Sequence, residues 1–372
     1  MARAAFINFP AHGHTNPSLP LVSELVRRGE QVTYYSFDEF RPGIERTGAV
    51  FRSYQPAFSF DHAHVDENQV RLAATLLEAT QPIVNFIAPQ IVAEKPDYII
   101  YDSLCLWGKY IAHVLGLPSV CSITTFALNR RVTSSTASQT INLIRMSLNA
   151  GSYMPRLRAA GQRLQRAYGL SKPGVLDVFS NSAMLNLVYT SAYFQPFASS
   201  FPESFKFVGP SLSNGSESEA PAFPELGEAP LIYISLGTVF NEQAGFYRMC
   251  FEALSGLKQP VVLSVGSKTD IATLGNIPKN FVVRNIVPQL QVLRRSVLFV
   301  THGGMNSVNE ALYYGVPLIV IPQAADQGWV AQRVAELGAG KTLMKARLSA
   351  PVCEPPRRPF LPIPLFGRQA HE

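Results

Sequence analysis

The chain has 372 residues, which is enough for two domains of ordinary size that each bury a core of their own. Apolar residues make up 47% of the chain and charged residues only 16%, a balance that excludes an intrinsically disordered protein. The net charge of +6 is weak support for a nucleic-acid partner, because half of it comes from residues 344–372, where five basic residues outnumber two acidic ones.

The first half of the chain alternates strand-like and helix-like segments. Residues 4–9 form an apolar strand, and a helix at 17–28, ended by Gly29, leads to a second strand at 31–37. We expect further strands at 50–54, 97–101, 119–124, 185–189 and 205–208. We expect helical segments at 68–94 and 133–170, and a helix that ends at Gly116. This alternation predicts a doubly wound α/β domain over residues 1–212, with right-handed crossovers.

A linker and a second alternation follow. Residues 213–229 are rich in Ser, Glu, Pro and Gly, which predicts an exposed interdomain linker. A second α/β domain is expected over residues 230–344. Its predicted strands are 231–236, 260–265, 281–284, 296–301 and 317–322, and its predicted helices are 244–257, 288–295, 306–314 and 328–337.

The last segment, residues 345–372, does not continue the pattern. It contains six prolines, which forbid a regular helix and predict an irregular proline-rich tail. One interpretation is an end that was never selected to pack, such as a frameshifted one, and another is a functional proline-rich ligand segment.

Location and redox environment follow from what the sequence lacks. No stretch approaches the roughly 18 consecutive apolar residues of a membrane-spanning helix. The first residues lack a signal-peptide pattern, so we expect a cytoplasmic protein with no membrane partner. The widely spaced cysteines, with no CxxC pair, favour buried thiols over disulfides or zinc; they are Cys105, Cys121, Cys250 and Cys353.

A histidine and an aspartate follow two strands of the first domain. In residues 10–17 (PAHGHTNP), Pro17 suits the first helical position, which places His14 just ahead of a helix N-terminus. The helix dipole there disfavours the imidazolium, so a neutral His14 can remove a proton from a hydroxyl. Asp102 follows the strand at 97–101, emerges at the same edge of the sheet and could fix the histidine tautomer. The alternatives are a loop histidine and a helix-capping aspartate.

Residues 301–327 (THGGMNSVNEALYYGVPLIVIPQAADQ) are the most informative stretch. Two glycines permit a tight turn after a strand, and Asn306 or Ser307 can cap a helix that ends before Gly315. Unpaired backbone N–H groups at such a helix start, where the dipole is positive, favour a phosphate.

Polar side chains flank this phosphate site. His302 is a further donor, and Glu310, about one turn beyond the start of the helix, can accept hydrogen bonds from the diol of a ribose. Gln323, Asp326 and Gln327 follow the next strand and can hold the hydroxyls of a sugar attached to the pyrophosphate. The sequence therefore predicts a nucleotide-sugar site.

This stretch resembles the donor-binding signature of the glycosyltransferases that include plant UDP-glycosyltransferases and bacterial macrolide glycosyltransferases. The matching positions are His302, Gly304, Asn306, Ser307, Glu310, Pro317, Pro322, Asp326 and Gln327. The resemblance implies pyrophosphate contacts by His302, Asn306 and Ser307, a ribose contact by Glu310 and sugar contacts by Asp326 and Gln327, with Gln327 favouring glucose. The alternative is an ordinary β-α-β unit whose glycines only make turns.

The resemblance extends to the first domain and to the fold. The segments GHTNP and YDS match the family, which implies His14 as the general base and Asp102 as its support, while His12 is ambiguous. It also implies a GT-B fold, two facing Rossmann-like domains with the active site in the cleft between them. Residues 1–212 would then bind the acceptor and residues 230–344 the nucleotide sugar.

Further contacts with both substrates are implied. Gly237 and Thr238 follow the strand at 231–236 and would contact the β-phosphate. Val287 and Gln289 lie where plant members have a tryptophan stacked on the base, which leaves uracil or thymine open. The acceptor would be lined by variable segments of the first domain that could equally be core; the side chains we select there are Phe58, Phe60, Phe126, Ile141, Met146 and Phe179.

Two competing motifs are weaker. Residues 335–342 (AELGAGKT) nearly spell a P-loop, but they follow a helix, so a helix C-cap is expected. The histidine pairs 12/14 and 62/64 lack partners at zinc-binding spacing. No Asp-x-Asp motif is present, so we expect no catalytic metal and no cofactor beyond the UDP-sugar co-substrate.

Together these features predict an inverting glycosyltransferase. It would move a hexose, most simply glucose, from a UDP-sugar to a hydroxyl of an apolar small molecule such as a macrolide or flavonoid, as a monomer or weak dimer. One alternative is a UDP-sugar epimerase on the same architecture. The other is a relic that binds nucleotide sugars without turnover because its C-terminal helices are lost.

Overall fold

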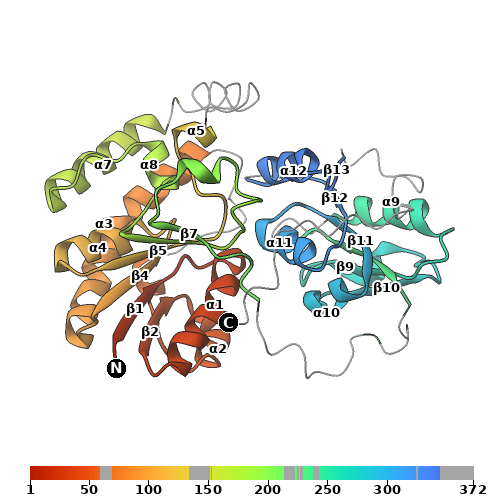
Figure 1. The fold of residues 1–372 in the computed structure, drawn as a ribbon, viewed down its shortest axis with the longest axis horizontal. Helices are drawn as coiled ribbons and strands as arrows, with labels where there is room; N and C mark the ends of the chain where they lie inside the picture. The colour runs from red at the N-terminus through yellow and green to blue at the C-terminus, as the bar shows by residue number, and fades with distance from the viewer. Residues whose placement is uncertain are drawn as a thin grey trace. The chain divides into compact units, whose positions relative to one another are not determined.

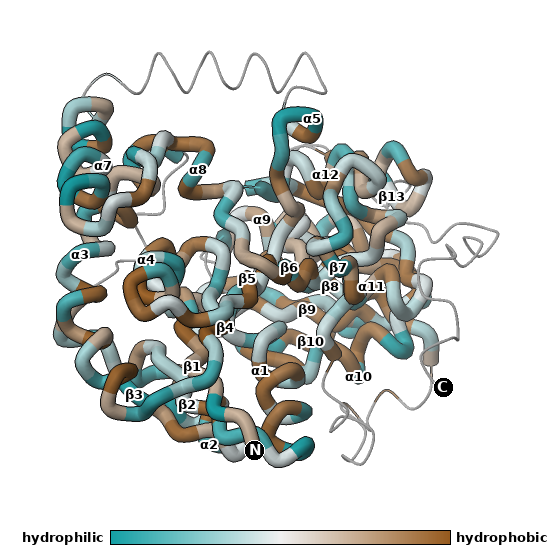
Figure 2. Tube along the Cα trace, turned by 60° about the vertical axis from the view of Figure 1, so that its left-hand side comes forward, coloured by the Kyte–Doolittle hydropathy of each residue, from teal (hydrophilic) through white to brown (hydrophobic). Residues whose placement is uncertain are grey.

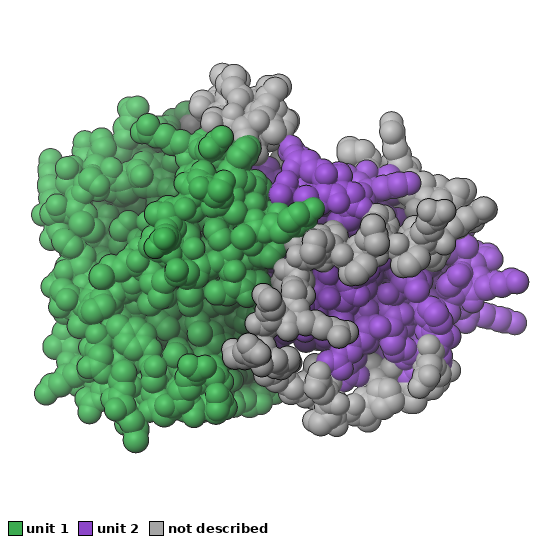
Figure 3. Space-filling model, viewed as in Figure 1, with its two compact units in different colours: residues 1–211 green, residues 212–372 purple. Residues whose placement is uncertain are grey.

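The computed structural model describes residues 1–58, 69–133, 151, 153–212, 223, 226, 229–237, 243–323 and 326–343. The chain divides into two compact units, Met1–Ser211 and Leu212–Glu372, which Figure 3 colours separately. Among the described residues, no helix has the length and apolar character needed to cross a membrane. The fold is therefore best described one unit at a time (Figure 1).

Unit 1 is built on seven parallel strands in the order β3-β2-β1-β4-β5-β6-β7. Its strands are β1 (Arg3–Ile7), β2 (Gln31–Ser36), β3 (Val50–Ser53), β4 (Tyr98–Asp102), β5 (Ser119–Ile123), β6 (Leu185–Val188) and β7 (Phe205–Phe207). The strand order reverses between β1 and β4, which pair directly. In open α/β sheets, ligands bind outside the carboxyl ends of the strands at such a switch point.

Helices connect these strands. They are α1 (His12–Arg27), α2 (Arg41–Glu45), α3 (Gln69–Glu94), α4 (Leu106–Leu115), α5 (Arg130–Thr133), α7 (Met154–Tyr168) and α8 (Val175–Phe179), with short 3₁₀ turns η1 (Asp38–Phe40), η2 (Gln55–Ala57) and η4 (Ala198–Ser200). Figure 2 shows α4 mostly in hydrophobic colours, whereas many hydrophilic residues lie along α7. The difference reflects position, because α4 packs on β4 and α3, while α7 packs on the outside of α3.

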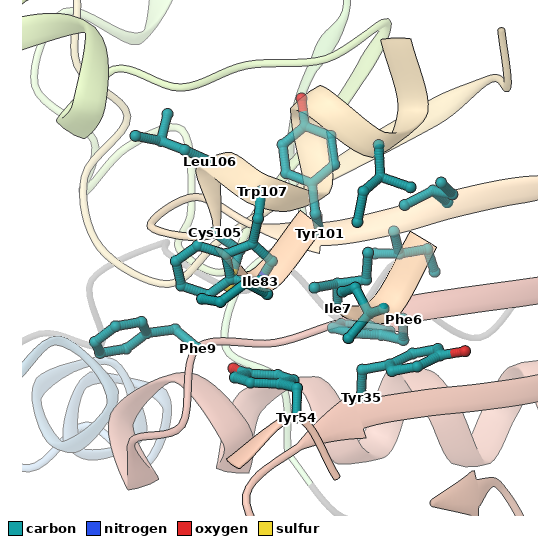
Figure 4. Packing of buried hydrophobic residues seen from close by; sticks show 14 of the residues in the cluster. Phe6, Ile7, Phe9, Tyr35, Tyr54, Ile83, Tyr101, Cys105, Leu106 and Trp107 are labelled. Atoms are coloured by element: carbon teal, nitrogen blue, oxygen red, sulfur yellow. The ribbon is translucent and has the colours of Figure 1, made fainter. Parts of the chain in front are cut away.

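Aromatic packing joins β1 to β2 and the end of β3 to α4. The rings of Phe6 and Tyr34 stack with centroids 4.7 Å apart, and Tyr54 meets the edge of Trp107 at 6.0 Å. Figure 4 shows Phe9, Tyr54 and Trp107 gathered on one side of this core. An added Cβ at Gly108 would lie 2.4 Å from Cβ of Tyr101, so helix α4 packs against β4 without room for a larger residue.

Unit 2 repeats the same plan with six parallel strands, in the order β10-β9-β8-β11-β12-β13. Its strands are β8 (Leu231–Ser235), β9 (Val261–Ser264), β10 (Phe281–Arg284), β11 (Ser296–Thr301), β12 (Leu318–Val320) and β13 (Gly340–Thr342). Its helices are α9 (Ala244–Leu254), α10 (Gln289–Arg294), α11 (Met305–Tyr313) and α12 (Gln327–Glu336), with a 3₁₀ turn η7 (Ile271–Leu274). The switch point of this sheet lies between β8 and β11.

The structure confirms two parallel-sheet α/β domains and corrects several local predictions. Helix α1 begins at His12, not at Pro17, so His14 lies inside its first turn. Helix α11 begins at Met305 with Gly304 as its N-cap, so neither Asn306 nor Ser307 is the cap. Their place in the first turn still leaves them beside the exposed N–H groups.

The P-loop-like segment has the structure of a helix end. Helix α12 ends at Glu336, and Gly338 adopts a φ of +66°, the left-handed conformation that often terminates helices. The edge strand β13 follows and was not predicted, because GKT lacks an apolar pattern. The predicted tail at 345–372 lies outside the described residues, as does most of the predicted linker at 213–229.

Candidate functional site

The backbone of helix α1 carries His14 to the switch point of unit 1. Ala11 adopts an extended conformation ahead of the helix, and its carbonyl accepts the N–H of His14 at 3.0 Å. The ring of His14 meets the edge of Phe9 at a centroid distance of 5.1 Å. The imidazole is thereby held at the carboxyl edge of the sheet, where β4 also ends.

His14 and Asp102 form a hydrogen-bonded pair. Nδ1 of His14 lies 2.8 Å from Oδ2 of Asp102, whose side chain is fully buried, while 15% of the His14 side chain is exposed. The other carboxylate oxygen, Oδ1, accepts the N–H of Leu104 at 2.8 Å. A carboxylate held in this way accepts a hydrogen bond from the N–H of Nδ1. We therefore assign the tautomer in which Nδ1 carries the proton and Nε2 carries the lone pair.

The hydroxyl of Thr124 is a second partner of His14, and the sequence analysis did not identify it. Its Oγ1 lies 3.0 Å from Nδ1 of His14, on the loop directly after β5. The sequence contained a signal for this contact. Thr124 is the last residue of the strand predicted at 119–124, so it emerges at the same edge of the sheet as Asp102. The ring is thus held from two neighbouring strands.

The thiols near this pair are packing groups. Cys105 and Cys121 are buried and reduced, and burial raises the pKa of both thiols. Cys250 is also a buried free thiol, as predicted, and Cys353 lies outside the described residues. The described part of the chain contains no group of three or more His, Cys, Asp or Glu side chains that could hold a metal ion. The prediction that no metal is needed stays a prediction.

Two glycines enclose His302 at the switch point of unit 2. An added Cβ at Gly237 would lie 2.5 Å from Cε1 of His302, and one at Gly304 would lie 2.6 Å from Nε2. Gly237 also has a φ of +78°, which side chains rarely adopt. The exits of β8 and β11 therefore approach each other closely only because these positions lack side chains. Thr238 lies outside the described residues.

The environment of His302 keeps its imidazole neutral. Burial lowers the pKa of His302 to about 4, and a hydrogen bond with the backbone of Ser235 opposes this only in part. At neutral pH the side chain therefore has one N–H and no positive charge, and it donates that N–H to a phosphate oxygen only by giving up the hydrogen bond with Ser235.

Helix α11 contains three of the residues predicted to hold pyrophosphate and ribose, Asn306, Ser307 and Glu310. Nε2 of Gln289 donates to Oε2 of Glu310 at 2.6 Å and to Oγ of Ser307 at 3.2 Å. Burial raises the pKa of Glu310 to about 7, and the Gln289 hydrogen bond opposes this rise. The structure thus brings Gln289, Ser307 and Glu310 together. Asn306 occupies the same helical turn.

The residues after β12 are arranged mainly by contacts with one another. Oε1 of Gln327 accepts the N–H of Gln323 at 2.7 Å, and Nε2 of Gln323 donates to the carbonyl of Ile321 at 2.7 Å. Asp326 directly precedes α12 and accepts the N–H of Trp329 through its backbone. Val287 is buried, so its side chain belongs to the core.

The three predicted acceptor residues that the structure describes are packed against other side chains of unit 1. Phe58 is buried against Trp107 and Phe37, and Phe126 is buried against Phe194. Phe179 ends the short helix α8 and is partly buried on the core of unit 1. Phe60, Ile141 and Met146 lie outside the described residues. The role of these side chains toward an acceptor stays a prediction.

Comparisons with known proteins identify the family to which this chain is similar. Residues 248–354 match the family described as "Erythromycin biosynthesis protein CIII-like, C-terminal domain". The chain is 37% identical over 355 residues to "Uncharacterized UDP-glucosyltransferase YojK" of Bacillus subtilis, an alignment that covers 94% of this chain and 87% of the relative. It is 29% identical over 357 residues to "Oleandomycin glycosyltransferase" of Streptomyces antibioticus, with 94% and 81% covered.

A solved structure is similar over almost the same length. The crystal structure titled as the glycotransferase of kitacinnamycin superposes with a TM-score of 0.79 at 29% identity, and covers 94% of this chain and 88% of that one. The proteins named in these comparisons transfer sugars, so the comparisons do not favour the epimerase interpretation of the nucleotide site.

Proposed function

This chain belongs to the bacterial macrolide-type glycosyltransferase family and has its GT-B fold, and we propose that it is an inverting transferase that uses a UDP-hexose. The hexose we propose is glucose. The acceptor is a hydroxyl of an apolar small molecule, such as a macrolide or a flavonoid. The name of the Bacillus relative, an uncharacterized UDP-glucosyltransferase, supports this donor.

The observation that carries the proposal is the pair formed by His14 and Asp102. A fully buried carboxylate 2.8 Å from Nδ1 supports a histidine whose Nε2 is the proton acceptor. The partial exposure of the His14 side chain allows a substrate hydroxyl to reach it. A histidine that only shapes a loop, or an aspartate that only caps a helix, would require neither the burial of Asp102 nor its contact with His14.

In the proposed reaction, Nε2 of His14 takes the proton of the acceptor hydroxyl while the hydroxyl oxygen attacks the anomeric carbon. The bond between this carbon and the β-phosphate oxygen breaks, and its electron pair leaves with UDP. A single in-line displacement inverts the configuration at the anomeric carbon. Asp102 stays ionised and stabilises the imidazolium that forms.

The leaving UDP would be stabilised by unit 2. Backbone N–H groups at the start of α11 and the neutral His302 donate to the pyrophosphate, with Asn306 and Ser307 beside them. Glu310 accepts the hydroxyls of the ribose. Glucose hydroxyls would be held by Asp326 and by amide groups of the loop after β12, once Gln323 and Gln327 rearrange from the contacts that they make with each other.

The experiment that tests this function is a transfer assay read by mass spectrometry. Wild type and His14→Ala are incubated with UDP-glucose or TDP-glucose and a panel of macrolides and flavonoids, and UDP-glucose alone serves as the control for hydrolysis and epimerisation. We expect a hexose adduct with wild type and UDP-glucose, and far less with His14→Ala.

Each other outcome contradicts a stated part of the proposal. Equal product from His14→Ala would exclude His14 as the base. Product with TDP-glucose alone would exclude UDP as the donor. Measurable UDP binding with no product from any acceptor would favour the relic that binds nucleotide sugars without turnover.

A further inference from the structure

A buried tyrosine lies beneath the ribose-binding carboxylate of unit 2. Tyr233 is in the middle of β8 and only 1% exposed. Its ring stacks on Phe299, its neighbour on β11, with centroids 4.5 Å apart and planes 10° apart. Burial raises the pKa of Tyr233, so its hydroxyl keeps its proton and acts as a hydrogen-bond donor. The stacking fixes where that hydroxyl points.

The tyrosine hydroxyl holds the oxygen of the Gln289 amide. It donates to Oε1 of Gln289 at 3.1 Å, which leaves both N–H groups of Nε2 for Glu310 and Ser307. In the flipped amide, a carbonyl oxygen would oppose the Glu310 carboxylate, so Glu310 selects the orientation in which Nε2 faces it. The hydrogen bond from Tyr233 then holds Oε1 of the amide in place.

We propose that Tyr233 is a positioning residue for the nucleotide, which acts through Gln289 to orient Glu310 and Ser307 toward ribose and pyrophosphate. The inference rests on the proposed function, because it assumes that these residues bind a nucleoside diphosphate. Gln289 engages Oε2 of Glu310, so Oε1 is directed to the ribose hydroxyls. Tyr233 itself touches no substrate, which is why no donor-binding motif includes it.

The contacts from Tyr233 through Gln289 to Glu310 and Ser307 form what we call the relay. Its effect depends on the charges around Glu310. Tyr233 faces it from β8, His302 lies at the end of β11, and His302 is neutral because burial lowers its pKa to about 4. On α10, Arg294 donates to the hydroxyl of Tyr314. On α12, Arg333 pairs with Glu336. The Gln289 amide is the group that hydrogen-bonds Glu310 directly, and it favours the ionised form.

The test compares Tyr233→Phe with a matched control in the same unit. Tyr247→Phe removes another buried hydroxyl, which donates to the carbonyl of Val265 away from the relay. Binding of UDP at pH 8 and of UDP-glucose between pH 6 and pH 9 is measured by calorimetry, and steady-state kinetics give kcat and the KM for UDP-glucose. Thermal unfolding shows that each variant is folded.

We expect Tyr233→Phe to weaken UDP binding and to raise the KM for UDP-glucose by about 3- to 10-fold, as for the loss of one buried hydrogen bond. At saturating donor, kcat stays near wild type. The pH at which binding is half-maximal moves upward, because a disordered Gln289 stabilises ionised Glu310 less. Tyr247→Phe leaves the affinity and the pH midpoint unchanged.

A double-mutant cycle separates a relay from independent effects. Gln289→Met removes the amide at similar size, so Tyr233→Phe should cost little more affinity in that background. Additive losses would overturn the relay, and so would wild-type affinity in Tyr233→Phe. Wild type that binds UDP but transfers no sugar would contradict the proposed function and leave the relay supported by these binding data. Wild type that does not bind UDP would overturn both.

Discussion

Each unit places a histidine at the switch point of its sheet, His14 after β1 and His302 after β11, and the two side chains have different environments. His14 follows the first strand of its sheet and is hydrogen-bonded to a buried carboxylate at 2.8 Å. His302 follows β11 and lies between Gly237 and Gly304, where burial lowers its pKa to about 4. The strand order sets where a functional histidine is presented, and the neighbouring side chains set what it can do.

The difference assigns a separate task to each histidine. A carboxylate that stabilises the imidazolium makes His14 suitable for taking up a proton during the reaction. Glycines that bring two strand exits close around His302 make it a neutral hydrogen-bond donor to an anion. The expected separation is that changes in unit 1 affect turnover and changes in unit 2 affect donor binding.

The largest effect is expected at His14. His14→Ala should lower kcat by about 10²- to 10⁴-fold, the usual contribution of a positioned general base, with UDP affinity unchanged. The matched variant is His302→Ala, which should weaken UDP binding and keep the wild-type pH profile of kcat. Steady-state kinetics and calorimetry on both variants test the separation. A loss of UDP affinity in His14→Ala would break it.

Asp102→Asn should have the next largest effect, a fall in kcat of roughly 10²-fold or more. The amide would donate to Nδ1 of His14 and leave the proton on Nε2, which is the wrong tautomer for a base. Asp97→Asn is the control, because Asp97 accepts the N–H of Arg3 at 2.7 Å at the opposite edge of the sheet. Wild-type kcat in Asp102→Asn, measured in the transfer assay, would show that the pair is structural.

Gly237→Ala should weaken UDP binding by about 10-fold or more. An alanine at a φ of +78° is strained by roughly 1–2 kcal/mol, and its Cβ would lie 2.5 Å from His302 and displace the ring. Gly245→Ala, in α9, is the control because an added Cβ there meets nothing within 4 Å. Calorimetry with UDP compares the two. Equal affinities would mean that the glycine contact with His302 is irrelevant to the donor.

The smallest expected effect is a pH dependence of donor affinity. The pKa of Glu310 is raised to about 7 by burial, and the ionised carboxylate is the better acceptor for ribose hydroxyls. Affinity for UDP-glucose should therefore rise severalfold from pH 6 to pH 8. UDP-glucose is the ligand for this measurement, and not UDP, because the esterified pyrophosphate of UDP-glucose does not titrate between pH 6 and pH 8.

Two further measurements sharpen this prediction. Glu310→Gln should bind more weakly at pH 8 and lose the pH dependence, and an unchanged slope in that variant would assign the titration to another group. The stability of the protein without ligand should show the opposite trend and fall as the pH rises. A carboxyl whose pKa is raised on folding contributes stability below its unfolded value of about 4.5, and that contribution is lost as the pH rises through about 7.

Sequence reasoning found most of the scaffold because the strands are short apolar runs bounded by turn residues. The predicted bounds of β10 and β11 agree with the structure at both ends, and Asp102 ends β4 at the predicted edge. The start of α1 was missed because Pro17 was interpreted as the first helical residue. Proline is normally accommodated only in the first turn of a helix, whereas α1 contains Pro17 as its sixth residue and Pro20 further on.

Contacts between distant residues account for what the sequence did not reveal. The hydrogen bond between Tyr233 and Gln289 joins positions 56 residues apart, and no local pattern specifies it. The approach of Thr124 to His14 spans 110 residues. The cap of α11 was misassigned because Gly304 takes an extended conformation there, while Asn306 and Ser307 lie in the first turn.

The parallel arrangement of each sheet has a consequence for how such a protein tolerates change. All strands of unit 1 end at one edge, where His14 and Asp102 lie, while contacts such as Arg3 with Asp97 tie the opposite edge together. Loops at the carboxyl edge can vary in length and composition without disturbing those ties. The catalytic residues and the variable loops therefore lie one strand length away from the contacts that tie the opposite edge, so the acceptor can change without a change in the scaffold.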